Sequence, residues 1–340
     1  MHSQSSIIPI VNLYRFLYIL CFPDEFSGNI LGVNMANNVF ICSDGHRLAY
    51  NLWLPSPNIE IKAFLQILHG MAEYSDRYAK FAEYLNKLGI AVFAADHRGH
   101  GATASEDELG WFAEQDGWNR VSEDAFELAN FVTSQYYVNT TFLMGHSMGS
   151  FLARTVMVKH PDFYTGVIIM GTGCGKGLVG KIGKMLCKRE IRKNGPKSPG
   201  VLMNKMSFSA YNKQFEPTAT DFDWLSRDAK EVEKYVKDDK CGFLCTNSFF
   251  YDLLTGIEFA NSRANAETLP KDLPLLIVSG EMDPVGDLGK GVTKVYKLYT
   301  DVGIADVTLK LFKDARHELL NEINKKEVYE YLANWLEAHI

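Results

Sequence analysis

The chain is predicted to be an α/β protein built around a mostly parallel, doubly wound sheet. Short, nearly continuous apolar runs alternate with stretches of helical spacing from residue 63 to 170, and the alternation returns from residue 275 onward. Strands that alternate with helices form parallel βαβ units, whose strands are buried on both faces. In such a sheet, functional side chains gather at the carboxyl ends of the strands.

The elements of the first half follow from these patterns in order. Residues 38–54 predict a hairpin, because two alternating runs flank the turn residues Asp44 and Gly45. Residues 35–173 form the first part of the predicted core. Its buried strands are expected at 63–68, 90–95, 142–146 and 167–170, and its helices at 78–88, 121–132 and 148–159.

The second half begins with an interruption of the pattern. Residues 174–270 contain no buried strand run but several amphipathic and aromatic stretches, which predicts a mainly helical insertion over the active edge of the sheet. The core resumes in residues 271–340. Strands are expected there at 275–279 and 307–312, and helices at 290–299 and 328–336.

Residues 1–34 stand apart from this plan. The run from Ile7 to Phe22 is mostly apolar, but it contains Asn12 and Arg15 and is shorter than the roughly 20 residues that span a bilayer. It lacks the basic start and the small-residue cleavage site of a signal peptide. We expect residues 1–34 to be either a peripheral apolar appendage or a segment upstream of a true start at Met35.

Composition argues against several classes of function. The 340 residues carry a formal net charge of −6, with a pI near 5.9, so no overall basic field exists to attract nucleic acid. The six cysteines have the spacing of neither a disulfide framework nor a four-ligand zinc site. We expect a cytoplasmic protein with reduced thiols and without metal or cofactor, and membrane association stays open.

One stretch carries the first chemical signal. An apolar run from Phe142 stops at Gly145-His-Ser-Met-Gly149, which predicts a strand, a sharp turn that carries Ser147, and a helix. A strained turn lifts the serine hydroxyl clear of the backbone, where a base can reach it. The two glycines are needed because the strand and helix backbones converge there. Ser147 is therefore the candidate nucleophile.

In this arrangement the partners of the serine follow it in the order acid, then histidine. After Ser147, only His317 lies in a loop just past a predicted strand, so it is the candidate general base. The acid is expected after the preceding strand, where Asp283 would hold the imidazole tautomer. Two carboxylates compete with it: Glu281, interpreted as structural, and Asp287, a candidate cap for the next helix.

Acyl transfer also needs hydrogen-bond donors for the oxyanion that forms at the carbonyl. The backbone N–H of Met148 directly follows the nucleophile. The loop after the strand that ends at His69 supplies the second donor, most simply the N–H of Met71. By their positions, His69 and His146 are further candidates for a base, but we interpret each as a structural residue beside a turn.

With these residues in place, the chain resembles the monoacylglycerol lipase and lysophospholipase-like branch of the serine α/β-hydrolases, especially its bacterial members. The resemblance implies an α/β-hydrolase fold in which residues 174–270 are a lid over an acyl-binding channel. It extends from Asn38 to the C-terminus and rests on five motifs in order: His69-Gly-Met-Ala-Glu-Tyr-Ser-Asp-Arg-Tyr78, Asp96-His-Arg-Gly-His-Gly101, Gly145-His-Ser-Met-Gly149, Ser279-Gly-Glu-Met-Asp-Pro284 and Ala315-Arg-His-Glu318.

One motif departs from the family pattern. Lipases of this family usually show H-G-x-G-E-H, and this chain has His69-Gly-Met-Ala-Glu-Tyr74. The departure leaves the donor at Met71 in place, because that donor is a backbone group.

The predicted lid begins with a basic amphipathic helix. Apolar residues recur at helical spacing from Leu178 to Leu186, among many basic residues and the single acidic residue Glu190. Such a helix either docks on an anionic membrane or lipid aggregate, or forms the solvated outer face of the lid. Its basic residues are Lys176, Lys181, Lys184, Lys188, Arg189, Arg192, Lys193 and Lys197.

The predicted reaction is hydrolysis of a small-molecule ester or lipid, namely a monoacylglycerol or lysophospholipid, through an acyl-Ser147 intermediate. One alternative is a serine aminopeptidase of the proline-iminopeptidase type, which would need lid carboxylates to hold the substrate amine. Asp221, Asp223, Asp228 and Glu231 keep that alternative open. The other is a non-catalytic binding protein of the same fold, which the complete set of catalytic residue types argues against.

Overall fold

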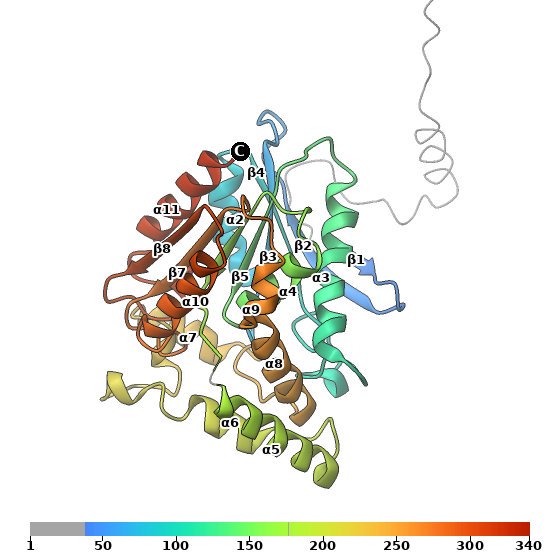
Figure 1. Cartoon of the computed structure of the whole chain (residues 1–340), viewed down its shortest axis with the longest axis vertical. Helices are drawn as coiled ribbons and strands as arrows, with labels where there is room; N and C mark the ends of the chain where they lie inside the picture. The colour runs from blue at the N-terminus through green and yellow to red at the C-terminus, as the bar shows by residue number, and fades with distance from the viewer. Residues whose placement is uncertain (1–37, 176) are drawn as a thin grey trace, which may run out of the picture. The chain divides into compact units, whose positions relative to one another are not determined.

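A single eight-stranded sheet runs through the part of the chain that the structure describes, in the order β1-β2-β4-β3-β5-β6-β7-β8 (Figure 1). The structure is a computed structural model that describes residues 38–175 and 177–340, so the predicted appendage 1–34 lies outside the described residues. β1 and β2 form the predicted hairpin, β2 pairs antiparallel with β4, and the pairs from β4 to β8 are parallel. The strands are β1 (Asn38–Ile41), β2 (Arg47–Trp53), β3 (Ala63–Leu68), β4 (Ile90–Ala95), β5 (Thr141–His146), β6 (Gly166–Met170), β7 (Leu275–Gly280) and β8 (Val307–Phe312).

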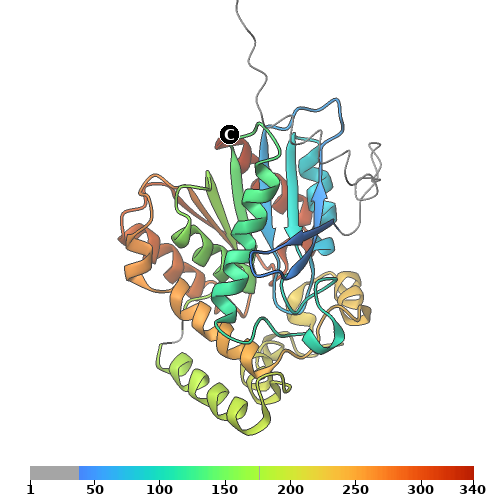
Figure 2. The same cartoon turned by 90° about the vertical axis from the view of Figure 1, so that its right-hand side faces the viewer.

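The sheet is covered on both faces, which explains the continuous apolar runs of its central strands. Every residue of β3 to β7 is buried. One core cluster joins the sheet to three helices on one face, and a second joins it to two helices on the other (Figures 1 and 2). The first set is α3 (Gly117–Thr133), α4 (Met148–Lys159) and α10 (Lys290–Asp301), and the second is α2 (Ala79–Asn86) and α11 (Lys325–Ala338).

The start of α10 differs from the sequence-based prediction. Asp287 was a candidate cap for this helix, but the N-cap is Gly289, whose φ is 81°. Asp287 instead lies in the preceding turn with φ 52°, and its backbone carbonyl accepts a hydrogen bond from the Lys290 N–H. The prediction was wrong because a left-handed glycine next to the helix allows the chain to turn without a side-chain cap.

Between β6 and β7 the described chain forms helices without a strand, and we call residues 174–270 the helical insertion. α5 packs against α8, and α8 packs against α3 and α4 of the core. Helices α5 and α6 of the insertion lie below the sheet in the view of Figure 1. Within the described ranges, no helix is both long and apolar enough to cross a membrane. The helices are α5 (Leu178–Asn194), α6 (Val201–Phe208), α7 (Ala229–Lys237), α8 (Asn247–Ala260) and α9 (Arg263–Glu267).

One buried side chain, Arg154 of α4, ties the start of the insertion to the end of its helix α8. Its guanidinium donates to the Gly173 carbonyl at 3.3 Å, just before the insertion begins. It also donates to the Ala260 carbonyl at 2.6 Å and to Asn261 Oδ1 at 3.0 Å, where α8 ends, and to the Tyr299 hydroxyl at 2.9 Å. Arg154 is fully buried, so these neutral oxygens replace its lost hydration.

β5 and α4 meet in a turn that leaves no space for side chains at its two glycines. A Cβ on Gly145 would clash with the Gly149 carbonyl, and a Cβ on Gly149 would clash with the Leu68 carbonyl of β3. Because the obstacles are backbone atoms of packed elements, they cannot move aside as a flexible side chain could.

We therefore expect Gly149→Ala to lower the free energy of unfolding by about 2–3 kcal/mol through overpacking. The measurement is urea unfolding of both proteins. Gly180→Ala in α5 is the matched control, since nothing lies within 4 Å of the added Cβ; it should stay within about 1 kcal/mol of the unmodified protein. Equal losses in the two variants would contradict the tight turn.

Candidate active site

Ser147 stands alone between the end of β5 and the first residue of α4, in a strained backbone conformation. Its φ is 54° and its ψ is −118°, values that cost a non-glycine residue on the order of 1–3 kcal/mol. The Ser147 N–H donates to the Met170 carbonyl at 3.0 Å, which joins the turn to the end of β6. The sequence-predicted turn is therefore present, with the serine at its apex.

Two further predicted residues form a buried pair. Asp283 follows β7 and His317 follows β8, and His317 Nδ1 lies 2.9 Å from Asp283 Oδ2. Asp283 also accepts from the Val285 N–H at 2.8 Å and from the Ser279 hydroxyl at 3.0 Å. Because Nδ1 donates its proton to a carboxylate, His317 Nε2 remains as the acceptor nitrogen.

The carboxylate of this pair is held in its charged form. Burial would raise the pKa of Asp283, but the attraction of His317 and the three hydrogen bonds outweigh burial, and its pKa lies below the ordinary value. The competing Glu281 is placed elsewhere, since its Oε2 accepts from the Asp314 N–H at 3.4 Å. The contact to His317 thus belongs to Asp283.

The turn that carries Ser147 and the loop that carries His317, called the histidine loop below, lie at the same edge of the sheet. The ring of His146, the residue before Ser147, lies 4.7 Å from the ring of His317, centroid to centroid. Gly171, just after β6, lies beside both rings: a Cβ there would be 3.1 Å from His317 Cε1 and 3.3 Å from His146 Cδ2. The carboxyl ends of β5, β6, β7 and β8 therefore bring together residues that are far apart in the sequence.

The loop after β3 brings Gly70, the residue before Met71, next to Ser147. A Cβ on Gly70 would lie 3.2 Å from Ser147 Cβ. The Gly70 N–H is already bonded to Glu73 Oε1 at 2.6 Å, so the next backbone donor along the loop is Met71. On the other side of the serine, the Met148 N–H belongs to the first turn of α4, where backbone donors lack partners within the helix.

His69 fixes the orientation of this loop. Its Nε2 accepts from the His97 N–H at 2.9 Å, so the ring proton is on Nδ1, which donates to the Gly70 carbonyl at 2.8 Å. Burial lowers the pKa of His69, which keeps the ring neutral. The Gly70 carbonyl and the Met71 N–H belong to one planar trans peptide, so holding the carbonyl also directs the N–H.

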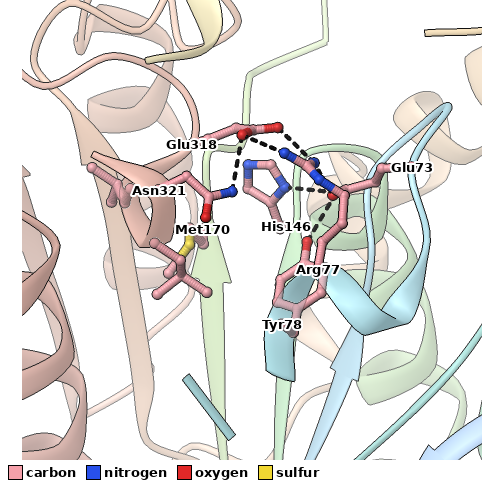
Figure 3. A pocket seen from close by; sticks show the side chains of 9 residues that line it. Glu73, Arg77, Tyr78, His146, Met170, Glu318 and Asn321 are labelled. Carbon is pink, nitrogen blue, oxygen red and sulfur yellow. Dashed lines mark hydrogen bonds and ion pairs between the residues drawn. The ribbon is translucent and has the colours of Figure 1, made fainter. Parts of the chain in front are cut away.

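A buried ionic network includes His146, the residue before the serine (Figure 3). Arg77 donates to both oxygens of Glu318 at 2.7 Å and to Glu73 Oε2 at 2.5 Å. Glu73 also accepts from the Tyr78 hydroxyl at 2.9 Å and lies 3.1 Å from His146 Nδ1. Since Glu73 follows β3 and Glu318 adjoins His317, Arg77 links the Met71 loop to the histidine loop.

The charged groups of this network stabilise one another in their ionised forms. Burial would raise the pKa of Glu73, but the charges of Arg77 and His146 outweigh it and hold the pKa well below the ordinary value. Burial would likewise lower the pKa of His146, but its hydrogen bond to Glu73 and the charge of Glu73 raise it. His146 Nδ1 faces Glu73 and Nε2 lies 3.4 Å from the His317 carbonyl, so its ring is engaged away from Ser147.

Sequence reasoning missed most of these supporting residues. Glu73, Arg77 and Glu318 stand inside the quoted motifs, and the signal that could have found them is the presence of charged residues within these motifs, such as Glu318 directly after His317. Trp224 gave no signal, although its ring lies 5.1 Å from that of His317. The insertion is fastened there, because the Glu318 N–H donates to the Leu225 carbonyl at 2.7 Å.

One group of side chains in the described ranges has the spacing of metal ligands. Donor atoms of Cys42, Asp44 and Asp124 lie within 4.8 Å of one another. Arg98 already donates to both carboxylates, at 2.5 Å to Asp124 and 2.8 Å to Asp44. The two carboxylates of this group are therefore already paired with a cation of the protein itself.

We expect Arg77→Met to lower the free energy of unfolding by about 3–5 kcal/mol, because it leaves buried carboxylates without their partner. The loss should be smaller in a Glu318→Gln background, and urea unfolding of the four proteins of this cycle measures the difference. Arg263→Met removes an exposed ion pair with Glu267 and should change stability by less than about 1 kcal/mol. Equal losses at Arg77 and Arg263 would contradict a buried network.

Comparison with known proteins agrees with this architecture. A family profile described as "Serine aminopeptidase, S33" matches residues 59–324. The chain is 24% identical over 307 residues to a monoacylglycerol lipase of Mycolicibacterium smegmatis, covering 87% of this chain and 95% of that one. It is 27% identical to the mouse monoglyceride lipase, covering 83% of each chain.

The solved structures give the same answer for the fold. A thermostable carboxyl esterase from Bacillus coagulans, solved in complex with glycerol, superimposes with a TM-score of 0.81 at 25% identity, covering 90% of this chain and 98% of the esterase. The predicted α/β-hydrolase fold and the predicted hydrolase class are both confirmed. The chain belongs to the serine aminopeptidase S33 family of α/β-hydrolases.

Proposed function

We propose that the chain is a serine hydrolase that hydrolyses lipid-like carboxylic monoesters such as monoacylglycerols, with Ser147 as its nucleophile. The observation that carries the proposal is the strained Ser147 at the sheet edge that also holds the buried His317–Asp283 pair. The monoglyceride lipases and the glycerol-bound carboxyl esterase among its relatives support the substrate class.

In the acylation step, His317 Nε2 takes the hydroxyl proton of Ser147 while Oγ attacks the ester carbonyl. The N–H groups of Met148 and Met71 stabilise the resulting oxyanion. When the tetrahedral intermediate collapses, the C–O bond to the alcohol breaks and the alcohol leaves with the proton from His317. Asp283 stabilises the imidazolium that exists between these two proton transfers.

Deacylation repeats the sequence with water in place of the alcohol. His317 takes a proton from the water, whose oxygen attacks the acyl carbonyl, and then returns a proton to Ser147 Oγ as the fatty acid leaves. The helical insertion serves as the lid over the acyl group. Trp224 supports this role, because it brings an apolar ring of the insertion against His317 and so excludes bulk water from the base.

An aminopeptidase needs free carboxylates near the site, but three of the four candidates in the insertion have other partners, and the fourth, Asp221, is exposed. Asp223 accepts from the Ala219 N–H at 2.8 Å and from the Thr220 N–H at 3.0 Å. Asp228 caps α7, and Glu231 forms ion pairs, 3.0 Å to Lys234 among them, that lower its pKa to about 2 although burial opposes them. These contacts favour ester hydrolysis over capture of a substrate amine.

We expect a fluorophosphonate probe to label the protein and Ser147→Ala to abolish the labelling, because the serine oxygen is the attacking atom. Hydrolysis of monoacylglycerols and short aryl esters should fall by a factor on the order of 10⁴ or more in the same variant. Thermal unfolding of Ser147→Ala serves as the control for folding. Cleavage of aminoacyl arylamides without cleavage of esters would overturn the assignment.

The lid also supports a proposal for how lipid reaches the site: α5 and α6 dock on an anionic lipid surface. Apolar side chains of both helices are exposed, for example Leu178 at 73%, Met185 at 63% and Val201 at 61%. Basic residues of α5 and the loop after it are exposed around them, and the side chain of Lys197 lies over the ring of Trp111. An apolar face bordered by positive charge fits the boundary of an anionic bilayer.

We expect charge reversal on the lid to weaken binding to phosphatidylglycerol vesicles by at least tenfold, because each basic residue near an anionic surface contributes about 1 kcal/mol to binding. The variant replaces four exposed residues by glutamate: Lys181, Lys188, Arg192 and Lys193. Vesicle sedimentation measures the binding. Hydrolysis of a short soluble ester should not change.

The matched control reverses three exposed lysines of α10, Lys290, Lys294 and Lys297, on the core. Equal weakening in both variants would show that net charge, rather than the lid, directs binding. Unchanged binding after reversal on the lid would refute the docking.

A further inference from the structure

Ala72, in the loop that carries the proposed oxyanion donor, has a backbone conformation that alanine seldom adopts. Its φ is 53°, in the left-handed region that favours glycine. The residue is 2% exposed and follows Met71 directly. Contacts from outside the loop are therefore needed to keep Ala72 in this conformation.

Two of those contacts come from the helical insertion and converge on one atom. The Ala72 carbonyl accepts from the Tyr235 hydroxyl at 3.0 Å and from the Gly242 N–H at 2.9 Å. Tyr235 lies on α7, and Gly242 lies in the loop that follows α7. A third contact joins the same parts, because the Tyr74 hydroxyl donates to Asp238 Oδ2 at 2.7 Å.

The loop is thus held from two sides, with Met71 in the middle. The core holds the Gly70 carbonyl through His69 at 2.8 Å, and the insertion holds the Ala72 carbonyl. Without the insertion contacts, Ala72 would relax toward negative φ, and the chain between the two carbonyls would reorient. The Met71 N–H lies on the first peptide plane of that span, which His69 holds by one hydrogen bond only, so this plane can still turn about that bond when the far end moves.

We infer that Tyr235 is a positioning residue for the reaction: its hydroxyl holds Ala72 in the left-handed conformation that aims the Met71 N–H at the oxyanion. This inference rests on the proposed function, since it assigns a role in the same site. It makes the oxyanion hole depend on the insertion, so that a correctly seated lid completes the donor pair. Tyr235 does not touch the substrate in this role.

The test uses Tyr235→Phe, which removes the hydroxyl and keeps the ring that lies 4.9 Å from the Arg77 guanidinium. We expect kcat for a soluble ester, 4-nitrophenyl butyrate, to fall about tenfold, as for loss of one hydrogen bond that acts in the transition state, with KM nearly unchanged. Ala72→Gly should restore most of kcat in the double variant Ala72→Gly/Tyr235→Phe, because glycine adopts positive φ without strain.

Tyr164→Phe is the matched control. It also removes a buried hydroxyl, one that donates to Gln66 Oε1 at 2.7 Å in the core, and kcat should not change. Thermal unfolding of each variant separates loss of folding from loss of rate.

The inference would be overturned if Tyr235→Phe lowered kcat by the same factor in the protein with Ala72 and in the Ala72→Gly background. The hydroxyl would then act through another group. No loss in an active enzyme would also overturn it, and would leave the proposed function standing. The proposed function itself fails if the unmodified protein neither hydrolyses esters nor reacts with a fluorophosphonate probe.

Discussion

The ion pairs of Arg77 are the interaction on which the site depends. Arg77 connects Glu73, which follows β3, to Glu318, which adjoins His317 after β8. Removing such charges from water costs several kcal/mol each, and the cost is offset only because two carboxylates face Arg77 and His146 in good geometry. The network is therefore weak evidence for stability, but it fixes the distance between two loops that must act together.

The helical insertion is bonded to the same loops that carry the proposed catalytic residues. Its segment around Trp224 and Leu225 lies against the histidine loop, and Arg227 pairs with Glu322 at 2.9 Å just beyond that loop. Its α7 region bonds to Ala72. By contrast, α5 and the first turn of α6 present exposed apolar side chains, and only Phe208 at the end of α6 packs on Trp224 among the ring contacts of the described residues. The insertion thus has a part that completes the site and a part that faces outward.

Local patterns predicted the strands and the turn around Ser147, because buried parallel strands and glycine-flanked turns leave a signal within a few residues. The contact between Asp283 and His317 could be predicted because chain order and strand ends limit the choices. The contact of Tyr235 with Ala72 could not, since it joins segments 163 positions apart that share no pattern. The cap expected at Asp287 was wrong because Gly289 provides the turn by backbone conformation alone.

Arg154 has a consequence for the exchange of insertions between proteins of this family. A grafted insertion would have to bring acceptor oxygens to the position where α8 ends, as Ala260 and Asn261 do here. An insertion without them would leave a fully buried guanidinium with only the acceptors of the core, whatever the quality of its own helices. The end of α8, rather than the rest of the insertion, therefore determines which insertions this core can accept.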